Sequence, residues 1–432
     1  QAAAAAYQGA MKQGRVIAGE FQRGQDNAGH DRPLPAGDMD ALGGLEVFAG
    51  NRDRVRSLQL LLGSLKHAST EEQKISAWQR ISAAFRSEEY WKLQTLTPLE
   101  ELPDWNEPGP SGGTEGVPWI KEGPLLFGVP DSWEAAKNDG ERWRFALARL
   151  AAFNVGLAAD SVLERARFSA SHFGLDQLAR YGGWNQDPDD IKALTEIEGL
   201  ADDEVITRTS DGIRRFNLPA VHHYIALFRS IIDTPKVREQ AVDALVRVFL
   251  DRRQYVKARE VLEKVISTHG AGPADSRKVL LTQITGNWGR FEPSATVPEG
   301  TRPKIPLVFR NATAIKFTAA PVDMDAVLAD TIAYLKDNPR ELEWERINPS
   351  AIASRIIADE RLKYVGKPEA SWEQALKPEE EHRDTLSDVE VPLDKAGAWW
   401  ISAQTTDGNK FHTLVWIVDN VLVQRDVAGQ KQ

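Results

Sequence analysis

The chain has 432 residues, a formal net charge of −10 and no cysteine. This length is typical of about two to four domains and is enough to bury a sizeable core. A chain without cysteine has no disulfide, cysteine nucleophile, cysteine zinc site or internal thioester. The acidic balance, with no run rich in Lys or Arg, argues against nucleic acids and acidic phospholipid surfaces as partners. No apolar stretch approaches the length of a membrane-spanning helix.

The N-terminal half of the chain is expected to be mainly helical after a weak start. Residues 1–50 mix Gly, Ala, Asp and Pro, which predicts a weakly structured segment with one helix near residues 7–16. Over residues 51–216, apolar residues recur at three- and four-residue steps, which is the pattern of amphipathic helices. Residues 99–130 interrupt this region with a long loop of Pro, Gly and Trp, which we expect to be pinned to its neighbours.

Residues 217–290 contain four consecutive segments with helical spacing, separated by turns that carry Pro or Gly. Helix pairs joined in this way are typical of α-solenoids. Within this stretch, residues 239–272 resemble one tetratricopeptide repeat, although Val246 stands where the repeat has a glycine. The resemblance is carried by Leu245, Phe249, Ala258, Leu262 and Val265, and we expect the first four of them in the core.

The C-terminal part is expected to be rich in β-structure. The composition shifts to Pro, Gly and Thr around residues 288–306, and we place the domain boundary there. Beyond it, alternating apolar residues predict strands, and residues 323–365 return to helical spacing. The sequence therefore predicts an α+β multidomain chain, in which a helical, solenoid-like region precedes a β-sandwich over residues 305–427 with a helical insert at 323–365.

The sharpest local prediction concerns a β-hairpin around Asp407 and Gly408. An Asp-Gly pair between alternating strands is a strong hairpin signal, and a two-residue loop fixes the register. That register places Trp399 opposite Trp416, Ile401 opposite Leu414 and Ala403 opposite His412. We expect Trp399, Trp416, Ile401 and Leu414 to face the core. A one-residue slip in the register would turn this face outward, so the register can be tested. The substitution Trp416→Ala should then cost roughly 3–5 kcal/mol.

Longer segments resemble a known family. The stretches LLFGVPDSWEAAKNDGERWRFALA (125–148), ADDEVITRTSDGIRRFNLP (201–219) and ITGNWGRFEP (284–293) are similar to the N-terminal part of large bacterial alpha-2-macroglobulin-like proteins of the planctomycete type. Residues 305–335 and 392–424 resemble the opening and closing strands of a macroglobulin-type sandwich. The resemblance implies a helical region, a first macroglobulin-like domain, and a secreted or cell-envelope (periplasmic) location. The thioester of that family needs a cysteine, which this chain lacks.

Two motifs point weakly towards catalysis or metal binding. His222 and His223 are adjacent, but neighbours on a helix point about 100° apart, so a core or surface role is favoured over a shared metal. Ser111 lies in a Gly-x-Ser-x-Gly pattern. A nucleophile elbow needs a strand before the serine and a helix after it, whereas a Pro/Gly loop surrounds Ser111, so we favour a turn.

Acidic and aromatic clusters are also interpreted as structural. The run Asp187–Asp190 and the pair Asp323 and Asp325 lack the spacing, glycine and closing glutamate of a calcium loop, so helix capping is favoured. Trp105, Trp119 and Trp133 lie near the long loop, and we expect them to dock it onto helices rather than form a ligand platform. The sequence therefore predicts no catalytic residue, no metal site and no cofactor.

Three functional hypotheses follow. In the first, the chain is a non-catalytic structural and binding region of an alpha-2-macroglobulin-like protein, which positions later domains for protease trapping or envelope protection. Its partners would be proteins, including proteases acting on the full-length protein, or its own downstream domains. The alternative is a free-standing scaffold of the tetratricopeptide type that binds a protein or peptide in a helical groove. An enzyme with an unrecognised site is the third hypothesis.

Overall fold

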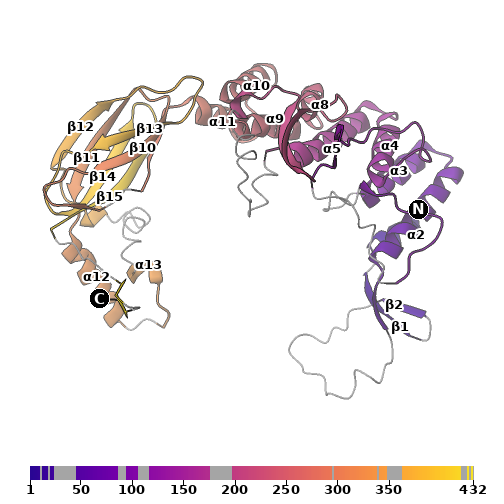
Figure 1. The fold of residues 1–432 in the computed structure, drawn as a ribbon, viewed down its shortest axis with the longest axis horizontal. Coiled ribbons are helices and arrows are strands. Elements are labelled where there is room, and N and C mark those ends of the chain that lie inside the picture. Colours follow the sequence, from indigo (N-terminus) through magenta and orange to yellow (C-terminus); the bar gives the residue numbers. More distant parts are fainter. Residues whose placement is uncertain are drawn as a thin grey trace, which may run out of the picture. The chain divides into compact units, whose positions relative to one another are not determined.

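The computed structural model describes residues 1–9, 12–17, 20–23, 45–85, 94–105, 116–175, 197–293, 296–337, 340–347, 362–419, 426–427 and 430–431. They divide into two compact units, Gln1–Arg253 and Gln254–Gln432, whose elements are labelled in Figure 1. The first unit is mainly helical and the second contains the larger sheets, so the chain mixes helix and sheet. The division lies within the predicted repeat segment 217–290, earlier than the expected boundary at 288–306.

The N-terminal segment has more structure than its composition predicts. Helix α1 (Ala2–Gly9) is followed by strands β1 (Gln13–Ile17), β2 (Glu20–Arg23) and β3 (Leu45–Phe48), which form an antiparallel sheet in the order β2-β1-β3. The expectation of one helix over residues 7–16 is therefore wrong. Local pattern misses this sheet because β1 pairs with the distant β3, as in Gly14 with Val47.

Four helices build the core of the first unit: α2 (Gly50–His67), α3 (Glu71–Phe85), α4 (Asp139–Ala151) and α5 (Val155–Phe173). Asn138 and Asn154 cap α4 and α5, because each side chain accepts a hydrogen bond from a backbone N–H of the first turn. Apolar faces then meet in one cluster of buried residues: Ala4, Leu58, Leu61, Trp78, Ile81, Phe85, Trp143, Ala146, Leu147 and Leu150.

A β-hairpin interrupts the region 51–216 that was expected to be helical. Strands β6 (Glu204–Thr209) and β7 (Gly212–Asn217) are joined by a short turn, after which Gly212 adopts a φ of +85° that favours glycine. The β-branched residues of β6 and the Asp-Gly pair before β7 are the signals that predict such a hairpin. These residues were assigned to a helical region, because the segments on both sides have helical spacing.

Part of the long Pro/Gly loop is held against this hairpin. Short strands β4 (Trp119–Ile120) and β5 (Gly123–Pro124) pair with each other. The N–H of Val117 donates to the carbonyl of Arg208 (3.1 Å), and the N–H of Ser210 donates to the carbonyl of Val117 (2.9 Å). Where it is described, the loop is thus tied to its neighbour by backbone hydrogen bonds.

Four further helices lie on either side of the division. Helices α8 (Tyr224–Ile231) and α9 (Arg238–Asp251) close the first unit, and α10 (Tyr255–His269) and α11 (Ser276–Thr285) open the second. Leu245 and Phe249 are buried on α9, and Ala258 and Leu262 are buried on α10. The segment that resembles a tetratricopeptide repeat is therefore split between two units.

Contacts within the second unit explain why α10 and α11 belong with the sheets. The side chain of Asn311 donates to the carbonyls of Ile284 (3.0 Å) and Gly286 (2.9 Å) at the end of α11. The guanidinium of Arg310 lies 4.7 Å from the ring of Tyr255 on α10. Because Arg310 and Asn311, at the end of the sandwich strand that begins at Lys304, contact these helices, the compact unit begins before the change in composition.

Two sheets form the sandwich. Strands β8 (Trp288–Phe291), β10 (Lys304–Arg310) and β13 (Thr385–Glu390) make one, in the order β13-β10-β8. Strands β9 (Val297–Pro298), β11 (Ala314–Pro321), β12 (Ala370–Ala375), β14 (Gly397–Thr405) and β15 (Lys410–Val418) make the other, in the order β12-β11-β14-β15-β9. Side chains from both sheets interdigitate, as Ile305 and Val391 do with Trp399 and Ile401. Short strands β16 (Asp426–Val427) and β17 (Gln430–Lys431) pair with each other.

The register of the β14–β15 hairpin is shifted by one residue from the prediction. Trp399 lies opposite Val415, Trp400 opposite Leu414, and Ala398 opposite Trp416. Trp399 and Ile401 face the sandwich core, whereas Leu414 and Trp416 are half-buried on the other face. The expected pairing of Trp399 with Trp416 is therefore wrong.

The turn explains the shift. A two-residue type I′ turn needs a positive φ at both central residues, but only Asp407 (φ +53°) has one, and Gly408 does not. The turn instead has three residues, closed where the N–H of Thr405 donates to the carbonyl of Asn409 (3.2 Å). The Asn409 amide is held outside the turn, because it bonds both the N–H (2.9 Å) and the carbonyl (2.7 Å) of Gly289 on β8.

Helices lie between β11 and β12, within the predicted insert 323–365. They are α12 (Met324–Lys336) and the short α13 (Trp344–Ile347), drawn in orange next to the sandwich strands in Figure 1. Val327 of α12 packs against Trp400 on the outer face of the larger sheet. The insert is thus anchored on the sandwich face that does not point into the core.

Candidate functional site

The predicted catalytic and metal candidates fall into structural positions or outside the described residues. His222 and His223 precede α8, and His222 Nε2 lies 2.8 Å from the carbonyl of Phe127. Asp323 caps α12 by accepting from the N–H of Ala326 (2.9 Å). Ser111 and Asp187–Asp190 lie outside the described residues. Within the described ranges, no group of three His, Asp or Glu residues is placed to hold a metal ion.

The three tryptophans near the long loop pack against other aromatic or basic side chains. Trp133 lies among aromatic rings of α3 and α4, 6.1 Å from Trp78. Trp119 lies 5.6 Å from Phe216 of β7, and Trp105 lies 4.5 Å from the ring of Phe21. These contacts dock segments onto the helices and strands, and they leave no open aromatic platform among the three.

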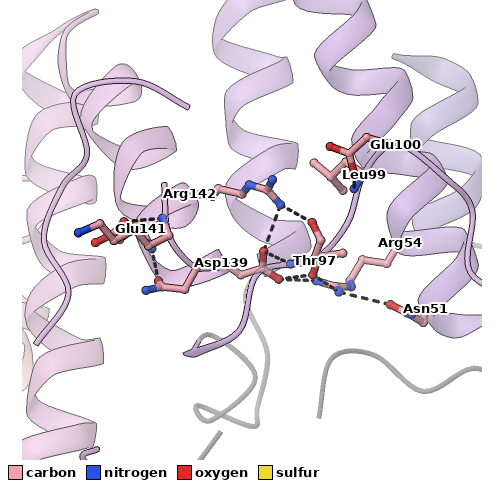
Figure 2. A network of polar contacts seen from close by, with 10 residues as sticks. Asn51, Arg54, Thr97, Leu99, Glu100, Asp139, Glu141 and Arg142 are labelled. Carbon is pink, nitrogen blue, oxygen red and sulfur yellow. Dashed lines mark hydrogen bonds and ion pairs between the residues drawn. The ribbon is translucent and has the colours of Figure 1, made fainter. Parts of the chain in front are cut away.

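A buried polar network joins α2, α4 and the segment that carries Thr97 (Figure 2). Asp139, at the start of α4, is 1% exposed. Its carboxylate accepts from the N–H of Thr97 (3.0 Å) and from the Thr97 hydroxyl. Arg142 Nη1 donates to the carbonyl of Thr97 (2.6 Å) and to Asp139 (3.4 Å). Arg54 Nη2 donates to the Thr97 hydroxyl (2.8 Å).

The network braces the fold. Both Asp139 oxygens are engaged by groups on the same chain, and the N–H of Asp139 donates to the carbonyl of Thr95 (2.7 Å). A carboxylate whose two oxygens are both engaged in this way does not suit a general base that must meet a substrate. It does fix one connecting segment to two helices at once, because a buried charge is stable only with its partners in place.

A small cavity of about 40 Å³ lies beside this network, among α4, α5 and the segment around Phe127. Its lining includes Arg144, Phe168, His172 and His222. Burial, with the nearby Arg144 charge second, lowers the pKa of His172 to about 3 and that of His222 to about 4. Both imidazoles are therefore neutral in the folded protein at physiological pH. Sequence pattern could not find this site, because its residues come from distant segments.

Stability should fall in mild acid because of these imidazoles. An unfolded histidine has a pKa of about 6.5, so between that pH and the depressed folded pKa the unfolded state binds more protons. The stabilisation is complete above about pH 6.5 and is lost as pH falls. For His222 we expect a loss on the order of 2 kcal/mol between pH 7 and pH 5. Urea unfolding at both pH values measures it. His222→Gln should flatten this dependence, and the exposed His67→Gln should not.

One face of α12 is an exposed apolar feature of the described insert. Leu328, Ile332 and Leu335 follow the i, i+4, i+7 spacing of a single helix face and are 56%, 41% and 44% exposed. Trp344 of α13 is 70% exposed. Val327, which points about 100° away from Leu328 around the helix, is buried against the sheet. The apolar spacing was visible in the sequence, but it does not by itself say which side is covered.

The insert is held in place by polar contacts at its base. The N–H of Asp323 donates to the carbonyl of Tyr364 (2.8 Å), where the chain returns from the insert. Asp330 of α12 accepts a hydrogen bond from the Tyr364 hydroxyl and lies 2.7 Å from Lys363 Nζ. The exposed face of α12 is therefore presented from a fixed base on the sandwich.

Comparisons with known proteins give a weak likeness. No family model matches the chain, and no curated protein matches it. It is similar to a structure of Escherichia coli alpha-2-macroglobulin that spans domains MG0-NIE-MG1, at 12% identity and a TM-score of 0.22, over 33% of this chain and 42% of that one. It is also similar to a structure of the same protein that spans NIE-MG1, at 14% identity and a TM-score of 0.23, over 33% of this chain and 65% of that one. The chain spans less than two thirds of either structure.

The described helices also include none that is long and apolar enough to cross a membrane.

Proposed function

We propose that the chain is a non-catalytic structural and binding region of an alpha-2-macroglobulin-like protein, and that its helical insert binds another protein domain. The observation that carries this proposal is the apolar face of α12, formed by Leu328, Ile332 and Leu335. Three such residues at helical spacing are the anchors used when a helix lies in a groove of a partner. The sandwich, together with the contacts of Asp323 and Asp330 to Tyr364, supplies the rigid base that such a surface needs.

Charge on the insert favours a protein partner over a lipid surface. Acidic residues flank the apolar face, among them Asp325 and Asp337 on or next to α12 and Glu341 and Glu343 before α13. An amphipathic helix that binds membranes usually has a basic polar face. The partner expected here offers an apolar groove with a basic rim, because opposite charges at the rim steer association.

The sequence resemblance supports the family part of the proposal, and with it a secreted or periplasmic location. The groove then belongs to a downstream domain of the same protein or to a protein that it captures. Protease trapping is proposed for the full-length protein only, since the thioester of that family needs a cysteine and this chain has none.

Photo-crosslinking tests the proposal. A photoreactive phenylalanine analogue replaces Leu328 or Ile332 in the full-length protein in the cells that produce it. We expect both positions to crosslink to the same protein domain, because they share one helix face. Crosslinks spread over many unrelated proteins, or none above the unirradiated sample, would overturn the proposal.

A second candidate function is supported by a hollow of about 190 Å³ among α5, α8 and α9. It is lined in part by Arg167, Arg247 and Phe228, which would suit an acidic peptide. This matches the alternative of a helical scaffold that binds a peptide. Specific crosslinking from position 247, with none from 328, would favour it over the insert.

A further inference from the structure

Arg144 is a buried cation for which the described residues supply no counterion. Its side chain lines the small cavity beside α4 and the residue is 5% exposed. Among the residues that the structure describes, no hydrogen bond or ion pair reaches its guanidinium, which lies 5.3 Å from the ring of Phe168. Burial lowers the pKa of Arg144 to about 10, with the nearby Arg165 charge adding to the effect. The group is still charged at neutral pH.

The surroundings of Arg144 leave this charge poorly compensated. Arg165 on α5 repels it. Glu141 attracts it, but the Glu141 carboxylate already accepts from the N–H of Lys137 (2.7 Å). The effective cost of burying an ion without a partner is several kcal/mol. A fold that keeps such a group in a cavity gains stability from any anion that enters.

The cavity also meets the N-terminus of α4. Gly140, in the first turn of that helix, belongs to the lining. The N-terminal end of a helix carries a partial positive charge, which favours an anion nearby. The guanidinium and the helix end act in the same direction, while the carboxylates of Asp139 and Glu141 in that turn, which are engaged by Thr97 and Lys137, act against them.

We propose that this cavity binds one small monovalent anion of halide size, with the Arg144 guanidinium as its main ligand. A single arginine balances a single negative charge. A volume of about 40 Å³ holds a few water-sized particles, which suits a halide. The rest of the lining is largely apolar, with Val117, Leu125 and Phe173. Phosphate or sulfate would bring more charge and more acceptors than these walls satisfy.

Bromide is the probe for this proposal. We expect the melting temperature of the whole chain to rise saturably with bromide at constant ionic strength, because a ligand that binds only the folded state stabilises it. Arg144→Met should weaken the apparent bromide affinity by about tenfold or more, since it removes a charge-assisted contact. Arg149→Met, at an exposed position of the same helix, should leave it unchanged.

A direct measurement covers the case in which Arg144→Met does not fold. Crystals of the unaltered protein soaked in bromide should show an anomalous peak within hydrogen-bond distance of the Arg144 guanidinium. No peak in the cavity, no saturable bromide effect, or an equal effect in Arg144→Met and Arg149→Met would each overturn the proposal. These outcomes leave the proposed role of α12 untouched, because the cavity and the insert lie in different units.

Discussion

Replacing Asp139 by alanine should destabilise the first unit by about 3–5 kcal/mol, the range expected when one partner of a buried ion pair is removed. The carboxylate is 1% exposed and accepts from both the backbone and the hydroxyl of Thr97. Without it, the Thr97 N–H loses its acceptor and Arg142 loses its counterion away from water, and an unsatisfied buried group has a high cost. Chemical denaturation followed by circular dichroism measures the change.

The matched control is Asp160→Ala. Asp160 also pairs with a cation, Lys236, at 2.5 Å, but both side chains are well exposed. Exposed ion pairs contribute at most about 1 kcal/mol, so this variant should stay close to the parent. A loss for Asp139→Ala as small as that of the control would mean that the network does not brace the fold.

The second large effect is expected from Trp399→Ala, at about 3–5 kcal/mol. Trp399 is 3% exposed and packs between the two sheets with Ile305 and Val391. Its indole N–H donates to the carbonyl of Lys395 (3.0 Å), so the ring is fixed as well as buried. The loss should appear in the unfolding free energy of the second unit.

Trp416→Ala provides the comparison, because Trp416 is half-buried on the opposite face of the same sheet. It should cost at least about 1 kcal/mol less, since less apolar area is lost from the core. The double variant should be additive to within about 0.5 kcal/mol, as expected for side chains without shared contacts. An interaction energy between the two substitutions well above that value would contradict this register and favour the one that places Trp399 opposite Trp416.

Local periodicity could predict much of the fold, and the failures share one cause. Helices α2, α3, α9 and α10 follow apolar spacing, and the strands of the sandwich follow alternation. The hairpin register could not be predicted, because Asn409 bonds to Gly289, which is far away in the sequence. Patterns within a segment do not report such long-range hydrogen bonds.

The candidate sites were less predictable than the fold. Thr97 and Asp139 are 42 positions apart, and Arg144 lies in the same helical pattern as its apolar neighbours, so neither the brace nor the cavity has a sequence signature. The face of α12 did appear in the sequence as helical spacing at Leu328, Ile332 and Leu335. Whether such a face is buried depends on how the insert docks, which only the structure shows.

The central claim is that the exposed face of α12 is covered by another protein domain in the full-length protein. A paired crosslinking measurement tests it most directly, with the photoreactive group at Leu328 or at Val279, which is similarly exposed (53%) on α11. The account predicts crosslinks to one domain from position 328 and only background from position 279. Equal yields and the same spread of products from the two positions would contradict it.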